Sequence, residues 1–166
     1  ERAARLKKWQ LQNPQVFQEI HAKACGSAKR SKMEIWLEPH LTQWGFTRNV
    51  QIRCQNHRKQ VDFVNQEQKI AIEVDGPWHF LPIHSQANFD KVQQRDRMLN
   101  EEIIRRSWRL IRLSMENFRS SSGELTSISL DQLFEMINDG TGTGILCLGS
   151  LYESLSWDGL KVTILK

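Results

Sequence analysis

The chain has 166 residues and a formal net charge of +4, and it has no apolar run near the roughly 20 residues that a membrane span needs. Its three cysteines form no CxxC pair and no Cys/His set with zinc-ligand spacing, so the sequence indicates neither a disulfide framework nor a structural zinc site. We therefore expect a cytoplasmic chain from a reducing intracellular compartment, with one domain plus extensions and no membrane partner.

Positive charge is concentrated in the first part of the chain. Residues 1–60 hold 12 Lys and Arg against 4 Asp and Glu, whereas residues 61–166 hold 11 against 15. Such a distribution predicts a polyanionic partner such as nucleic acid, although a solvated basic helix without a partner is the alternative. The candidate nucleic-acid contacts are Arg5, Lys7, Lys8, Lys29, Arg30, Lys32, Arg58 and Lys59.

Two helical segments are predicted before the first strand. Residues 1–30 form a basic helical arm, interrupted at "NP", and Ser31 then opens a stronger helix with Glu34 in the position of a capping box. We expect Pro39 to kink or shorten this helix and Gly45 to follow its end.

Three strands are expected next: "FTRNVQIRC" over 46–54, then 61–64 and 69–74 on either side of "NQEQ", with "QNHRK" as a turn. If the second turn is centred between Gln66 and Glu67, Asp62 lies opposite Ala71 and diagonal to Glu73. Asp75 shares that face by the two-residue period of a strand.

The three carboxylates Asp62, Glu73 and Asp75 therefore crowd one patch. Like charges at this spacing repel and raise each other's pKa unless a cation lies between them, and oxygen ligands favour Mg²⁺ or Mn²⁺. The alternative is a solvent-facing sheet whose acids pair with lysine or arginine. His79 follows a sharp Gly-Pro turn, and its near-neutral pKa would suit proton transfer, although a lone histidine is commonly structural.

A helix over 89–106 places a carboxylate on its apolar side. Asp96 occupies the missing position of a stripe formed by Phe89, Val92, Leu99 and Ile103. We expect Asp96 to face the sheet that carries the other acids, or else to be a buried residue paired with Arg95 or Arg112. A buried strand over 107–114 follows.

These elements predict an α/β fold in which a mixed sheet is flanked by helices. The core covers residues 31–118, preceded by the helical arm. Residues 119–166 are expected to form a small appendage made of a linker, the short amphipathic helix "SLDQLFEMIND" and a C-terminal hairpin.

Taken together, Glu34, Asp62, "IEVDG" followed by His79, Asp96 in "RD" and the strand "WRLIRL" resemble the PD-(D/E)XK nuclease superfamily. The branch they resemble most is that of the very short patch repair endonucleases and the related homing endonucleases with a Glu, Asp, His, Asp signature. The resemblance covers residues 31 to about 118 and implies a restriction-endonuclease-like fold. It also implies metal-dependent hydrolysis of double-stranded DNA, with a homodimer or two successive nicks if both strands are cut.

The same resemblance implies a role for each residue. Asp62 would bind the metal, His79 would manage the proton of the attacking water or a nearby phosphate, and Asp96 would support His79 or the hydrated metal. Glu34 would complete the site, although the capping box explains it equally well. Asp75 stands where the superfamily's lysine is expected, which leaves open whether Glu73 and Asp75 are ligands or supporting groups.

A second resemblance implies another function. "KIAIEVDGPWHF" is similar to the core of the RAP domain of organellar RNA-processing proteins. On that alternative the chain would bind RNA, or cut it weakly, in an organelle or the nucleus rather than cut DNA. Glu34 and Asp96 fit the nuclease better than this module.

Overall fold

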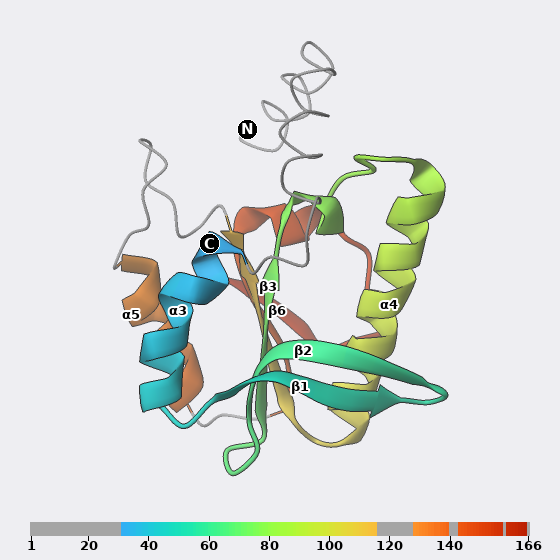
Figure 1. The fold of residues 1–166 in the computed structure, drawn as a ribbon. Coiled ribbons are helices and arrows are strands. Elements are labelled where there is room, and N and C mark those ends of the chain that lie inside the picture. Colours follow the sequence, from blue (N-terminus) through green and yellow to red (C-terminus); the bar gives the residue numbers. More distant parts are fainter. Residues whose placement is uncertain (1–30, 116–127, 140–142, 158, 166) are drawn as a thin grey trace.

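The computed structural model describes residues 31–115, 128–139, 143–157 and 159–165, and the predicted arm over 1–30 lies outside these ranges (Figure 1). One mixed sheet contains six strands in chain order. The first three pair antiparallel and the last four pair parallel, with β3 common to both sets. The strands are β1 (Thr47–Cys54), β2 (His57–Asn65), β3 (Ile70–Asp75), β4 (Arg109–Ser114), β5 (Gly144–Leu148) and β6 (Val162–Leu165).

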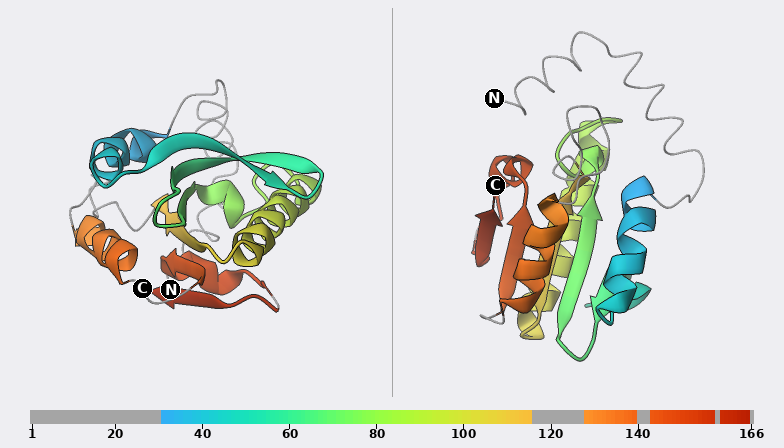
Figure 2. Two further views of the ribbon diagram at one scale, coloured as in Figure 1. Left: turned by 90° about the horizontal axis from the view of Figure 1, so that it is seen from below. Right: turned by 90° about the vertical axis from the view of Figure 1, so that its left-hand side faces the viewer.

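Helices cover both faces of this sheet. α3 (Lys32–Gln43) and α5 (Ile128–Asn138) lie on one face, and α4 (Gln86–Arg105) lies on the other (Figures 1 and 2). Two apolar cores result, one under each layer of helices. The central strands β3 and β4 are buried along their whole length, as expected for strands covered on both faces. The predicted mixed sheet flanked by helices is confirmed, and no helix among the described residues is long and apolar enough to cross a membrane.

The capping box predicted at the start of α3 is present. The Ser31 hydroxyl accepts from the Glu34 amide and Glu34 Oε1 accepts from the Ser31 amide, both at 3.1 Å. The helix continues past Pro39 to Gln43, so the proline does not end it. Gly45 follows with φ +82°, the left-handed conformation that glycine adopts at helix ends.

The turn predicted at "QNHRK" is shorter in the structure. Cys54 pairs with His57, so only Gln55 and Asn56 form the turn, and residues 57–59 belong to β2. This part of the prediction was wrong because polar composition was taken as a turn signal. At this end of the hairpin Ile52 and Cys54 of β1 are buried in the core under α4, whereas His57 and Arg58 of β2 are exposed, so a strand here accepts polar residues.

The register of β2 against β3 is displaced from the predicted one by two residues. Val64, rather than Asp62, lies opposite Ala71. The Asn65 side chain accepts from the Gln68 amide at 3.0 Å and so fixes a turn later than the one expected. A shift of two residues leaves each side chain on its predicted face and moves Asp62 from the diagonal position to one beside Glu73.

The predicted C-terminal hairpin is also wrong. β5 and β6 are parallel and extend the same sheet, joined by a crossover that contains the short helix η3 (Ser150–Ser154). Within the crossover, Leu151, Tyr152 and Trp157 are buried on the face covered by α4. Their burial explains the crossover, since a hairpin would leave this apolar set without a core to enter.

Candidate active site

Side chains from α3, β2, β3 and α4 line one pocket of about 270 Å³. The short helix η1 (Pro77–His79) closes it beside the end of β3. The pocket brings together five of the six predicted catalytic and metal-binding residues, with Asp75 outside its lining. The polar side chains that line it are Glu34, Lys59, Asp62, Glu73, His79, Arg95 and Asp96.

Asp62 and Glu73 meet where the ladder between β2 and β3 ends. The last pair of this ladder is Phe63 and Ile72. Beyond it, carboxylate side chains accept the hydrogen bonds of the backbone amides. Asp62 Oδ2 accepts from the Val74 amide at 2.8 Å, and Glu73 Oε1 accepts from the Asp62 amide at 3.3 Å. This exchange fixes both carboxylates at the pocket.

The ionisation of Asp62 is strongly perturbed. Burial, followed by repulsion from Glu73, raises the pKa of Asp62 from 3.8 to about 8. The hydrogen bond from the Val74 amide acts in the opposite direction but is outweighed. The protein therefore supplies too little positive charge to keep Asp62 ionised at neutral pH.

The imidazole of His79 is held by two carboxylates. Its Nδ1 lies 2.7 Å from Asp96 Oδ2 and 3.3 Å from Asp75 Oδ1. The Gln93 amide donates to the His79 carbonyl oxygen at 2.6 Å and fixes the backbone of this segment. Nδ1 thus carries the proton that faces the acids, and Nε2 has no hydrogen-bond partner among the described residues.

The two acids also control the charge on this imidazole. Burial alone would lower the pKa of His79, but attraction to Asp75 and the contact with Asp96 outweigh it and raise the pKa. Asp96 is itself buried, and its pKa is lowered because Arg112 and His79 outweigh the effect of burial. Asp96 is therefore an ionised partner that orients the ring and favours its protonated form.

Asp96 lies on the side of α4 that faces the sheet, as its place in the apolar stripe predicted. It also pairs with Arg112 Nη2 at 3.1 Å, one of the two partners considered for a structural role. Asp96 therefore combines a buried ion pair with a contact to His79.

Asp75 is fixed by a buried arginine and a buried tyrosine. Arg112 donates to Asp75 Oδ2 at 2.6 Å and to Oδ1 at 2.7 Å, and the Tyr152 hydroxyl donates to Oδ2 at 2.8 Å. Asp75, His79 and Asp96 have possible ligand atoms within 4.8 Å of one another and could hold a metal ion. Since three donors already occupy the Asp75 oxygens, the contacts favour a supporting role for this residue over the predicted one of ligand.

Lys59 enters the site from β2, where it had been assigned to the nucleic-acid surface. Its Nζ lies 3.1 Å from Glu73 Oε2 and 3.1 Å from Asp96 Oδ1. Although burial opposes its charge, these acids raise the pKa of Lys59. The sequence did not predict this role, because residues 55–59 were expected to form a turn. Nor did any sequence signal link Arg112 and Tyr152 to Asp75.

Glu34 lines the same pocket while it caps α3. The two explanations that the sequence left open are therefore compatible.

Of the predicted nucleic-acid residues, Lys32 and Arg58 are exposed. Arg5, Lys7, Lys8, Lys29 and Arg30 lie outside the described residues.

Comparison with protein-family models and with curated proteins finds no match to this chain. The contacts, burial and charges of the pocket are therefore the grounds for assigning a function.

Proposed function

We propose that the chain is a metal-dependent endonuclease that hydrolyses phosphodiester bonds in double-stranded DNA. One observation carries the proposal: Asp62, Glu73 and Asp96, from three different elements, line one pocket beside the imidazole of His79. The sequence resemblance to nucleases, based on these same residues, supports the choice of substrate.

The residues of the pocket fit a hard divalent cation. Asp62 and Glu73 offer oxygen ligands side by side, and the raised pKa of Asp62 indicates that positive charge is lacking there. We assign these two carboxylates to Mg²⁺ or Mn²⁺. When bound, such a cation lowers the pKa of a water molecule and offsets the charge that develops on a phosphate.

His79 is the group suited to move the proton. Asp96 fixes Nδ1, and Nε2 is the ring nitrogen left for the reaction. The raised pKa of His79 favours the protonated ring, which donates a proton from Nε2 to the leaving oxygen; only the neutral ring accepts one from the attacking water. Lys59 adds a positive charge at the pocket. Glu34, on the α3 side, adds negative charge near Asp62.

Two conservative substitutions test this assignment. Asp62→Asn removes a ligand charge and His79→Gln removes the proton carrier, while both keep a polar side chain of similar size. We expect each to lower Mg²⁺-dependent cleavage of labelled duplex DNA by about 10²–10⁴-fold. Binding to the same duplex in EDTA, followed by fluorescence anisotropy, should change little.

Asp131→Asn is the matched control, because Asp131 is exposed on α5, on the opposite face of the sheet from α4. It should cleave as the unsubstituted chain does. If cleavage and binding fall together in Asp62→Asn and His79→Gln, both residues are structural and the enzyme assignment fails. Retention of RNA in preference to duplex DNA, with no product in Mg²⁺, would instead support the RNA-binding alternative.

A further inference from the structure

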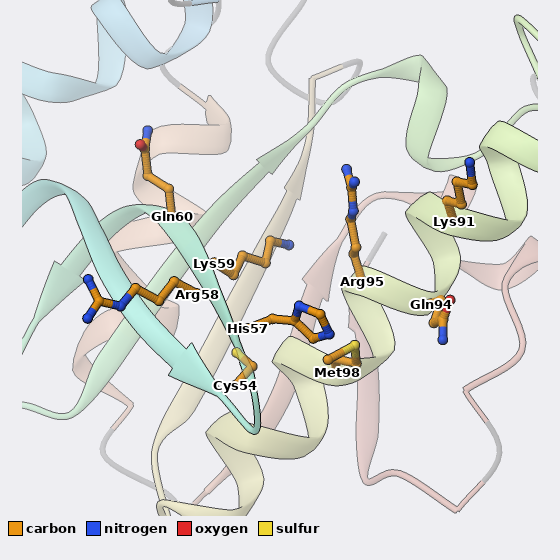
Figure 3. Close-up of a pocket in the computed structure, with 9 residues that line it drawn as sticks. All are labelled: Cys54, His57, Arg58, Lys59, Gln60, Lys91, Gln94, Arg95 and Met98. Carbon is orange, nitrogen blue, oxygen red and sulfur yellow. The ribbon is translucent and has the colours of Figure 1, made fainter.

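A cationic groove separates the β1–β2 hairpin from α4 (Figure 3). It has a volume of about 570 Å³, and no aspartate or glutamate lines it. β2 contributes His57 and Lys59, and α4 contributes Lys91, Gln94 and Arg95. The proposed chemistry uses only Lys59 from this set.

The α4 side of the groove presents hydrogen-bond donors and no acidic side chain. Lys91, Gln94 and Arg95 follow one another at helical spacing and are exposed. Within the described ranges, none of the three side chains makes a hydrogen bond or an ion pair. Since solvent is their only partner there, an anion could bind them without breaking an existing contact.

The groove leads directly to the acidic pocket. Lys59 and Arg95 line both spaces, and Lys59 Nζ reaches Glu73 and Asp96. A strand with one phosphate at the carboxylates would therefore have its neighbouring phosphates within the adjoining cationic groove.

We propose that this groove binds the sugar–phosphate backbone of the cleaved DNA strand next to the bond that is cut. Lys91 and Arg95 each contact one phosphate, and Gln94 donates a neutral hydrogen bond. This inference rests on the proposed nuclease function. It places a DNA contact on α4, in a part of the chain whose overall charge is negative.

The test compares two double variants that remove the same charge. Lys91→Gln with Arg95→Gln neutralises the groove. Lys69→Gln with Lys161→Gln neutralises two exposed lysines on the loops that precede β3 and β6, neither of which lines the groove. Affinity for a labelled duplex is measured in EDTA over a range of salt concentrations, and cleavage kinetics are measured in Mg²⁺.

The slope of log K against log[salt] is negative, and each lost phosphate contact makes it less steep by about one. We therefore expect the slope of the groove variant to be less steep than that of the control by about two. Its KM should rise more than its kcat falls, because the groove binds the strand but does not react. Unchanged melting temperatures would confirm that both variants fold.

The two variants could show equal slopes and equal KM values while the unsubstituted chain binds and cuts DNA. That result would overturn the proposed role of the groove and leave the nuclease assignment unaffected. Failure of the unsubstituted chain to bind or cut duplex DNA would overturn both.

Discussion

At the scale of single residues, burial beside another acid makes the charged form of Asp62 unfavourable. Its pKa is raised to about 8 because it is buried beside Glu73, and in the unfolded chain it returns to its ordinary value near 3.8. Between these pH values the folded chain keeps a proton that the unfolded chain has released. The contribution of Asp62 to the free energy of unfolding therefore falls as the pH rises from about 4 to about 8.

This linkage predicts the behaviour of Asp62→Asn in metal-free buffer. The amide is neutral at every pH, so the variant should be more stable than the unsubstituted chain at about pH 8 and similar to it near pH 4. Urea denaturation in EDTA at several pH values measures the difference. Mg²⁺ should then stabilise the unsubstituted chain more than the variant, and two parallel stability profiles would contradict the raised pKa.

Residue patterns predicted some members of the site and concealed others. Asp96 was found because a carboxylate interrupted an apolar stripe, and the stripe is local information along one helix. Lys59 was predicted only as a nucleic-acid contact, because its place in the pocket depends on contacts with Glu73 on the neighbouring strand and Asp96 on α4. It also lies in "QNHRK", which was predicted to be a turn.

At the scale of elements, Glu34 connects the start of α3 to the pocket. Glutamine also completes a capping box, so Glu34→Gln should leave the free energy of unfolding within about 0.5 kcal/mol of the unsubstituted value. It should still reduce cleavage by roughly 10-fold through weaker cation binding. Ser31→Ala provides the contrast, with a stability loss of about 1 kcal/mol and a smaller change in cleavage.

Both quantities can be measured on the same preparations by urea denaturation and by initial rates across a Mg²⁺ titration. If Glu34→Gln cleaves normally at every Mg²⁺ concentration, Glu34 serves only as a cap.

The buried ion pair of Asp75 and Arg112 joins β3 to β4, and Tyr152 links the crossover between β5 and β6 to it. Tyr152→Phe removes only the hydroxyl that donates to the Asp75 carboxylate. We expect it to lower the free energy of unfolding by about 1.5–3 kcal/mol, the range for hydrogen bonds to charged groups.

Ser154→Ala is the control in the same short helix, since the Ser154 hydroxyl donates to the neutral Leu151 carbonyl at 2.7 Å. Its loss should cost only about 1 kcal/mol. Chemical denaturation measures both variants, and an equal or smaller cost for Tyr152→Phe would show that the crossover does not support the acid.

Local signals predicted most of the elements but not how they pair. The capping box, the strand period and the apolar stripe each involve residues a few positions apart. The β2–β3 register depended on the Asn65 side chain, and the parallel pairing of β6 depended on burial of the crossover against a distant core. Neither the Asn65 contact nor the burial of the crossover is part of the capping box, the strand period or the apolar stripe.

At the scale of the whole molecule, the sheet order brings the acids together. The antiparallel β2–β3 pair places Asp62 beside Glu73, while α4 packs across the sheet and adds Asp96. Tyr152 reaches Asp75 from 77 residues away in sequence, so the support of the site is completed only when the C-terminal strands join the sheet. A sequence pattern that stops near residue 118 could not include it.

The most direct test of the central claim is the position of a bound cation in crystals soaked with Mn²⁺. The anomalous peak should lie within coordination distance of carboxylate oxygens from both Asp62 and Glu73, in the pocket that His79 lines. A peak confined to other acids, or an ordered pocket that takes up no Mn²⁺ while Lys59 bridges Glu73 and Asp96, would contradict the metal-dependent nuclease.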